Sequence, residues 1–131
     1  MKRSTFLLLS CLLGILLNAC AFDLIHVKQI PTKIVTTNLS KTSFELEKDV
    51  NLDLNHGYTR KLKQGTKWNH VGTISYGDVF RSKDQILTVE ASNIHEAYIV
   101  VESGKVVGFY LPVESTYSPL GDPQMLNMKG K

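Results

Sequence analysis

The chain has 131 residues, with 15 Lys and Arg against 12 Asp and Glu and a formal net charge of +3 at pH 7. This length is enough for one domain with a modest hydrophobic core. Lys2 and Arg3 precede an apolar N-terminal run, and without them 13 basic residues face 12 acidic ones. Nucleic-acid binding needs a concentrated positive face, so we expect no nucleic-acid partner.

The first twenty residues have the pattern of an export signal. After Lys2 and Arg3, residues 4–19 are uncharged and predominantly apolar, and they end in the small residue Ala19. A positive start, an apolar segment and a small residue are the order of a secretory signal peptide. Because the apolar part is shorter than the roughly 20 residues that span a bilayer, we predict a processed signal over 1–19.

The segment Leu17-Asn18-Ala19-Cys20 resembles the lipobox of bacterial lipoproteins, in which leucine, a small or polar residue and a small residue precede cysteine. This resemblance covers residues 1–20. It implies that Cys20 carries diacylglycerol, that the chain is cut before it, and that the new amino group is acylated with a fatty acid such as palmitate. Two or three acyl chains hold a protein firmly at a membrane, since each buried methylene contributes about 0.8 kcal/mol. The alternative is an ordinary signal peptide cut after Ala19, which leaves a free thiol.

Residues 20–23 are predicted to form the lipid anchor and a short tether, because the strand-like segment "LIHVKQI" begins at residue 24. Without a Gly/Ser-rich linker, the domain is expected to lie close to the lipid headgroups. In lipoproteins of this kind, a residue such as Ala21 permits transfer to the outer membrane, which implies an outer-membrane protein facing the periplasm. Cys11 leaves with the signal and Cys20 carries lipid, so we expect no disulfide.

The next segment predicts a β-hairpin. Apolar and polar residues alternate over "SFELEKDVNLDLN", which is typical of a strand with one buried face, and Asn55-His56-Gly57 suits a hairpin loop. A turn about His56 places apolar residues opposite apolar ones and acids opposite bases. The predicted pairs are Leu54 with Tyr58, Val50 with Leu62, Asp49 with Lys63, and Glu45 with Lys67.

Further strands follow. "TKWNHVGTISYGDVF" and "DQILTVEA" predict two or three, with turns at Gly77-Asp78 and Ser82-Lys83-Asp84. A second hairpin is centred on Ser103-Gly104. Because both of its faces are apolar, we expect it to be central and covered on both sides, with a bend or a close neighbour at Gly108. Its predicted pairs are Glu102 with Lys105, Val101 with Val106, Val100 with Val107, Ile99 with Gly108, and Tyr98 with Phe109.

Short strands with regularly spaced turns predict an all-β domain over residues 24–117. We expect a small antiparallel β-barrel or sandwich of SH3-like or OB-like size, built of meandering hairpins. Residues 118–131 contain two prolines and two glycines and show no periodicity, so they predict a flexible tail.

Chemistry-bearing residues are few. The four histidines, His26, His56, His70 and His95, lack the spacing and the cysteine partners of a zinc site, so we expect no metal and no cofactor. The acidic residues Glu45, Glu47, Asp49 and Asp53 are interpreted as the solvated face of a strand, with a site for a cation or a cationic partner as the alternative. No nucleophile stands in a strand-to-helix elbow, so we predict no catalytic residue and no enzyme activity.

Aromatic residues suggest where a partner binds. Trp68 has His70 on the same strand face, and "GFYLPVESTYSPL" holds more large apolar residues than we expect a small core to accept. We therefore predict Trp68, Tyr110 and Tyr117 as partner-binding residues. The alternative is that Trp68 belongs to the core and that Tyr117 and Leu120 fold back over one end of the barrel.

These features predict a membrane-anchored periplasmic lipoprotein that acts as a non-enzymatic binding or assembly module, with another envelope protein as its partner. A second hypothesis is an inhibitor of a cell-wall hydrolase, because lysozyme-inhibitor lipoproteins are also small lipid-anchored β-barrels. Their Ser-Gly-x-x-Tyr loop is not matched here, since Lys105, Val106 and Val107 follow Ser103-Gly104. A third is a peptidoglycan-binding SH3-like module, which needs an exposed aromatic groove.

Overall fold

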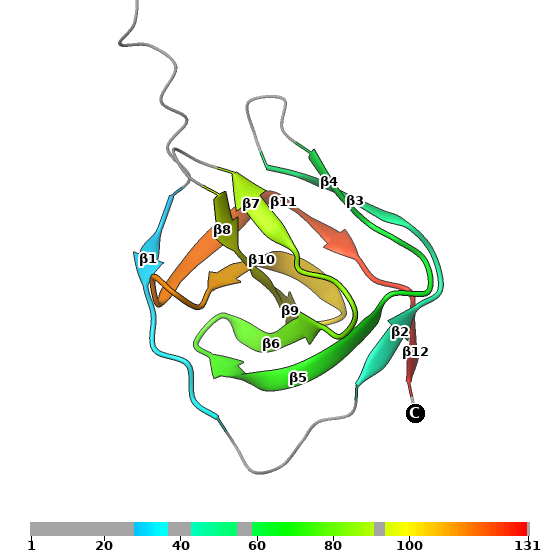
Figure 1. Cartoon of the computed structure of the whole chain (residues 1–131), viewed down its shortest axis with the longest axis horizontal. Helices are drawn as coiled ribbons and strands as arrows, with labels where there is room; N and C mark the ends of the chain where they lie inside the picture. The colour runs from blue at the N-terminus through cyan, green and yellow to red at the C-terminus, as the bar shows by residue number, and fades with distance from the viewer. Residues whose placement is uncertain (1–27, 37–42, 55–58, 91–93, 131) are drawn as a thin grey trace, which may run out of the picture.

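The computed structural model describes residues 28–36, 43–54, 59–90 and 94–130. These residues form twelve β-strands and no helix, which confirms the predicted all-β class (Figure 1). Consequently, the described part of the chain offers no helix of the length and apolarity that a membrane crossing requires. The predicted signal peptide, lipobox and tether lie outside the described residues.

Eight of the strands form one antiparallel sheet. In spatial order they are β1 (Ile30–Pro31), β11 (Thr116–Met125), β10 (Lys105–Leu111), β9 (Tyr98–Glu102), β6 (Gly77–Ser82), β5 (Lys67–Ile74), β2 (Phe44–Leu46) and β12 (Met128–Gly130). The other four form two hairpins: β3 (Val50–Asp53) with β4 (Thr59–Leu62), and β7 (Thr88–Glu90) with β8 (Ile94–Glu96).

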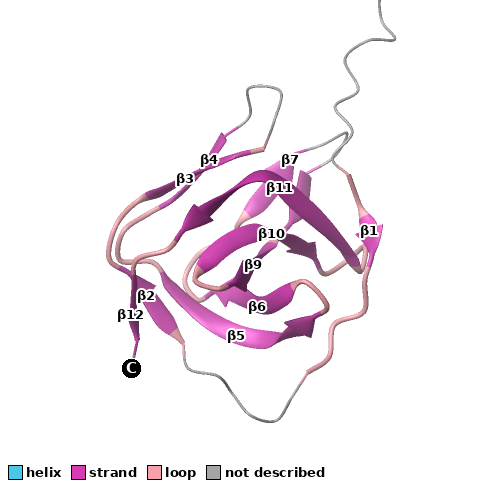
Figure 2. Cartoon of the chain, turned by 180° about the vertical axis from the view of Figure 1, so that it is seen from behind, coloured by secondary structure: helices cyan, strands magenta, loops and turns pink. Residues whose placement is uncertain are grey.

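The large sheet is strongly curved, because short connections tie distant strands together. β11 is second in the spatial order and β12 is last, yet only Leu126 and Asn127 separate them in sequence. On the other side, the segment after β1 reaches β5, where Val35 and Thr73 exchange two backbone hydrogen bonds of 2.9 Å. The sheet therefore curls into an open barrel, as Figures 1 and 2 show from opposite sides.

Both faces of the central strands are covered, as predicted for the second hairpin. Alternate residues of a strand point to opposite faces. Ile99 and Phe109 belong to the larger hydrophobic cluster, which also contains Trp68, whereas Val100 and Tyr110 belong to a second cluster. This double burial explains why β9 and β10 consist of nearly continuous apolar residues.

The register of that hairpin differs from the prediction beyond its first two pairs. Lys105 lies opposite Glu102 and Val106 opposite Val101, as predicted. A β-bulge between Val106 and Gly108 then shifts the ladder. It therefore places Gly108 opposite Val100, Phe109 opposite Ile99 and Tyr110 opposite Tyr98, in place of the predicted pairs. Phe109 consequently shares a face with Ile99 and not with Tyr98, its predicted partner.

The first hairpin confirms two of its predicted pairs, whereas the predicted Asp49–Lys63 pair is part of neither described ladder. Val50 lies opposite Leu62, and Glu45 lies opposite Lys67. The expected single strand is divided into β2 and β3 by a bend, where the Asp49 carboxylate accepts a hydrogen bond of 2.7 Å from the backbone N–H of Gln64. The loop at 55–58 lies outside the described residues, and with it Tyr58 of the predicted Leu54–Tyr58 pair.

Two boundaries differ from prediction. The β5–β6 turn is at Ser75-Tyr76, so Asp78 lies inside β6. The predicted flexible tail over 118–131 is wrong: β11 and β12 extend the domain to Gly130, and the Leu126 side chain is buried between them. The two prolines of β11 are tolerated because its ladder with β1 includes only Thr116 and Tyr117.

Candidate functional site: a basic pocket

The three residues predicted to contact a partner do not lie on the surface. Trp68, Tyr110 and Tyr117 are 2%, 3% and 4% exposed, respectively. The Tyr117 hydroxyl donates a hydrogen bond of 3.1 Å to the carbonyl oxygen of Val107, and its ring stacks on Tyr76 at 4.1 Å between centroids. Burial raises the pKa of Tyr117, with a smaller contribution from Tyr76. The prediction of a binding surface at these residues is therefore wrong, and they belong to the core.

Two histidines form structural pairs. The side chain of His70 is 2% exposed, and its Nε2 lies 3.1 Å from Oδ1 of Asp78, an oxygen that also accepts a hydrogen bond from the Thr73 hydroxyl. His95 is hydrogen-bonded through Nδ1 to Glu114. His26 and His56 lie outside the described residues. Within the described ranges, no three side chains of the metal-ligating types come together.

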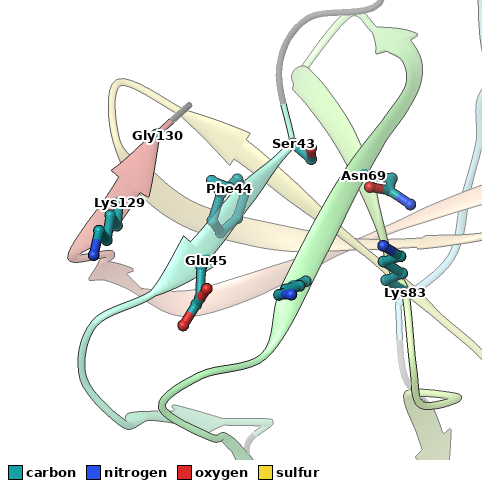
Figure 3. A pocket seen from close by; sticks show the side chains of 8 residues that line it. Ser43, Phe44, Glu45, Asn69, Lys83, Lys129 and Gly130 are labelled. Carbon is teal, nitrogen blue, oxygen red and sulfur yellow. The ribbon is translucent and has the colours of Figure 1, made fainter.

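A cavity of about 260 Å³ lies where β2, β5 and β12 run side by side, next to the end of β6. Its lining combines three lysines with an amide, a hydroxyl, a carboxylate and part of a phenyl ring. The lining residues are Ser43, Phe44, Glu45, Lys67, Asn69, Lys83, Lys129 and Gly130 (Figure 3).

Sheet register brings the charged residues of this pocket together. Glu45 on β2 lies directly opposite Lys67 on β5 and, on its other side, opposite Lys129 on β12. Residues directly opposite each other share one face of a sheet. Lys83 lies beside Lys67 on the segment after β6, because its backbone N–H donates a hydrogen bond of 2.9 Å to the carbonyl oxygen of Lys67. Four charged side chains thus come from four segments that are distant in sequence.

The pocket carries more positive than negative charge. Three lysines and one glutamate leave a formal excess of two positive charges in the lining. Among the described residues, no carboxylate forms a salt bridge with Lys67, Lys83 or Lys129. The nearby Arg81, opposite Asn69 on β6, has its own partner at 3.9 Å in Glu96. The three ammonium groups are therefore available to an anion.

Glu45 differs in its surroundings from the other three acidic residues of the alternating segment. Glu47, Asp49 and Asp53 are exposed, as expected for the solvated face of a strand. Glu45 is half-buried between two lysines, an environment that suits an anionic ligand and disfavours a cation. Sequence reasoning placed Glu45 opposite Lys67 but did not assign them to a site, because Lys129 belonged to the predicted tail and Lys83 to a turn.

Comparison of the chain with protein-family models, with curated proteins and with solved structures finds no match.

Proposed function

We propose that the protein is a lipid-anchored binding module of the bacterial cell envelope, attached through Cys20 and without catalytic activity. The observation that carries this proposal is the segment Leu17-Asn18-Ala19-Cys20 at the end of an uncharged apolar run that follows Lys2 and Arg3. Acyl chains on this cysteine would keep the domain at a membrane. Ala21 favours the outer membrane, with the domain facing the periplasm.

The domain itself supports a binding role. Most of its described aromatic side chains are buried in the core, and its charged pocket holds three lysines that have no described carboxylate partner. Ammonium, amide and hydroxyl groups hold a ligand by charge and by hydrogen bonds. A small, rigid β-sheet is a suitable scaffold for such a site, because register sets the positions of the side chains.

Acylation is tested by intact-mass analysis of the membrane-extracted protein and by metabolic labelling with palmitate. The wild type should lose residues 1–19 and carry acyl groups on Cys20. Cys20→Ser should accumulate as an uncut, unlabelled precursor at the inner membrane. Cys11→Ser is the matched control and should be processed and labelled like the wild type. Mature, outer-membrane Cys20→Ser protein in quantity would show that the anchor is wrongly assigned.

The partner is tested by crosslinking the lipidated protein in cells and identifying what is captured with it. The proposal expects one envelope protein to be enriched over a second, unrelated lipoprotein used as bait. Enrichment of a lysozyme or an amidase would favour the inhibitor hypothesis. Enrichment of glycan without protein would favour peptidoglycan binding.

A further inference from the structure

We propose that the pocket at β2, β5 and β12 binds a phosphomonoester group on a hydroxyl-rich ligand, such as a phosphorylated sugar. This inference names the ligand class of the proposed binding module. It rests on the binding role alone and is independent of the anchor at Cys20.

The net charge of the pocket favours a phosphomonoester over a carboxylate. The lining has a formal excess of two positive charges, and a phosphomonoester carries about −1.5 to −2 at pH 7. One such group therefore nearly neutralises the site, whereas a single carboxylate leaves about half of the excess. Lysine is a common phosphate ligand because its ammonium acts as a point charge with three donors.

The position of Glu45 divides the pocket into two parts. Figure 3 shows Glu45 between Lys129 on one side and Asn69 and Lys83 on the other. Lys67 and Lys83 lie on neighbouring segments joined by a backbone hydrogen bond, and like charges in such positions repel each other. An anion beside this lysine pair and the Asn69 amide would relieve that repulsion. We therefore place the phosphate at Lys67 and Lys83, on the side of Glu45 that is opposite to Lys129.

The carboxylate then faces the rest of the ligand. An ionised carboxylate only accepts hydrogen bonds, so Glu45 would bind a hydrogen-bond donor of the ligand, such as a hydroxyl group. The cavity of about 260 Å³ is just below the range of roughly 300–1,000 Å³ for drug-sized ligands, so it has room for one small ring beside the phosphate. A hydroxyl-bearing ring with one phosphomonoester satisfies both parts of the pocket.

The pocket also lies far from the start of the described chain. β1 and β12 are at opposite ends of the sheet order, and Figures 1 and 2 both show them on opposite sides of the domain. If the domain is attached by its N-terminus, the pocket lies on the opposite side of the domain from β1, the first described strand. This placement favours a soluble or glycan-borne phosphate over a lipid headgroup of the same leaflet.

The test is calorimetric titration of the full-length protein, in neutral detergent at low salt, with glucose 6-phosphate and with inorganic phosphate. Saturable one-to-one binding of both is expected, with glucose 6-phosphate the tighter. Lys67→Gln and Lys83→Gln should each weaken binding roughly tenfold, since each removes a charged hydrogen bond. Lys105→Gln, an exposed lysine at the β9–β10 turn, is the matched control and should bind like the wild type.

Glu45→Gln separates the two parts of the pocket. It should tighten the binding of inorganic phosphate, because a negative charge is lost, and should reduce the preference for glucose 6-phosphate. Absence of saturable binding, equal affinity for sulfate or succinate, or unchanged affinity in Lys67→Gln and Lys83→Gln would each overturn the proposal.

A mixed-micelle arm identifies the source of the phosphate. The protein is kept in neutral detergent, and the readout is displacement of bound glucose 6-phosphate by phosphatidic acid, a phosphomonoester lipid, or by phosphatidylglycerol, a phosphodiester lipid. Displacement by phosphatidic acid alone would assign the group to a headgroup, whereas equal displacement by both lipids would indicate diffuse electrostatic attraction and would overturn the proposal. The readout is ligand binding at the pocket and not attachment to lipid, so a failed ligand test and a failed anchor test are distinguishable.

Discussion

Gly108 on β10 lies against Tyr117 and Ser118 of β11, and replacing it with alanine tests this close contact. A Cβ atom at this position would lie 2.5 Å from the carbonyl oxygen of Ser118 and 2.5 Å from Cε2 of Tyr117. Neither group can move aside freely, because the first belongs to the β11 backbone and the second to a buried ring stacked on Tyr76. Gly108→Ala must therefore separate the two strands or displace the ring.

The expected loss of stability has two parts. Overpacking of a core costs roughly 1–3 kcal/mol, and loss of the hydrogen bond from the Tyr117 hydroxyl to the carbonyl oxygen of Val107 costs about 0.5–1.5 kcal/mol. We therefore expect Gly108→Ala to lower the free energy of unfolding by about 1.5–4.5 kcal/mol, the sum of the two parts. The corresponding fall in Tm is roughly 5 °C or more.

Urea unfolding followed by near-ultraviolet circular dichroism measures this loss. Gly130→Ala is the matched control, because an added Cβ there meets no atom within 4 Å, and it should unfold like the wild type. Combining Gly108→Ala with Tyr117→Val should cost less than the sum of the two single changes, since the smaller side chain frees the space. A Gly108→Ala midpoint within error of the wild type would refute the close contact between Gly108 and β11.

Three other predictions concern single residues. Gly77→Ala should destabilise the domain more than Gly65→Ala. Both glycines have positive φ, but a Cβ at Gly77 would lie 2.5 Å from a backbone oxygen of β9, whereas a Cβ at Gly65 would meet no described atom within 4 Å. Equal urea midpoints of the two variants would contradict this prediction. Burial, and to a lesser extent Tyr76, raises the pKa of Tyr117 above the ordinary tyrosine value of 10.0. The contribution of Tyr117 to the free energy of unfolding should therefore be complete below pH 10.0 and fall as the pH rises through the raised pKa. Absorbance titration should show one late tyrosine that is missing in Tyr117→Phe. Ser82→Ala should be neutral or stabilising by up to about 1 kcal/mol, because its buried hydroxyl has no hydrogen-bond partner among the described residues, and a clear loss of stability would indicate a partner.

Register was predictable where the side-chain pattern determines it locally. In the first hairpin, the alternation around Val50 and the charge match of Glu45 with Lys67 both indicate the observed pairing. The bulge of the second hairpin was not predictable in this way, because it accompanies the packing of Tyr117 on Gly108, between residues of different strands. Local alternation contains no information about such a contact.

The basic pocket, likewise, was only partly predictable from the local sequence pattern. Half of it, the Glu45–Lys67 pair, follows from the first hairpin. The other half requires β12, whose residues were expected to form a tail because prolines at 119 and 123 interrupt the periodicity. The prediction that Trp68, Tyr110 and Tyr117 contact a partner failed for a related reason. Two apolar clusters, one on each face of the sheet, accept more large side chains than the single core that we assumed.

The strand pairings at both ends of the sheet have a consequence for the order of folding. β1 pairs with β11, and β2 pairs with β12, so both edges of the sheet join segments before residue 47 to segments after residue 115. Contacts between residues so far apart in sequence form slowly. A chain that is still being synthesised therefore cannot complete either edge before β11 and β12 have been made. If the protein is exported as we propose, this order would delay folding of the domain until late in its synthesis.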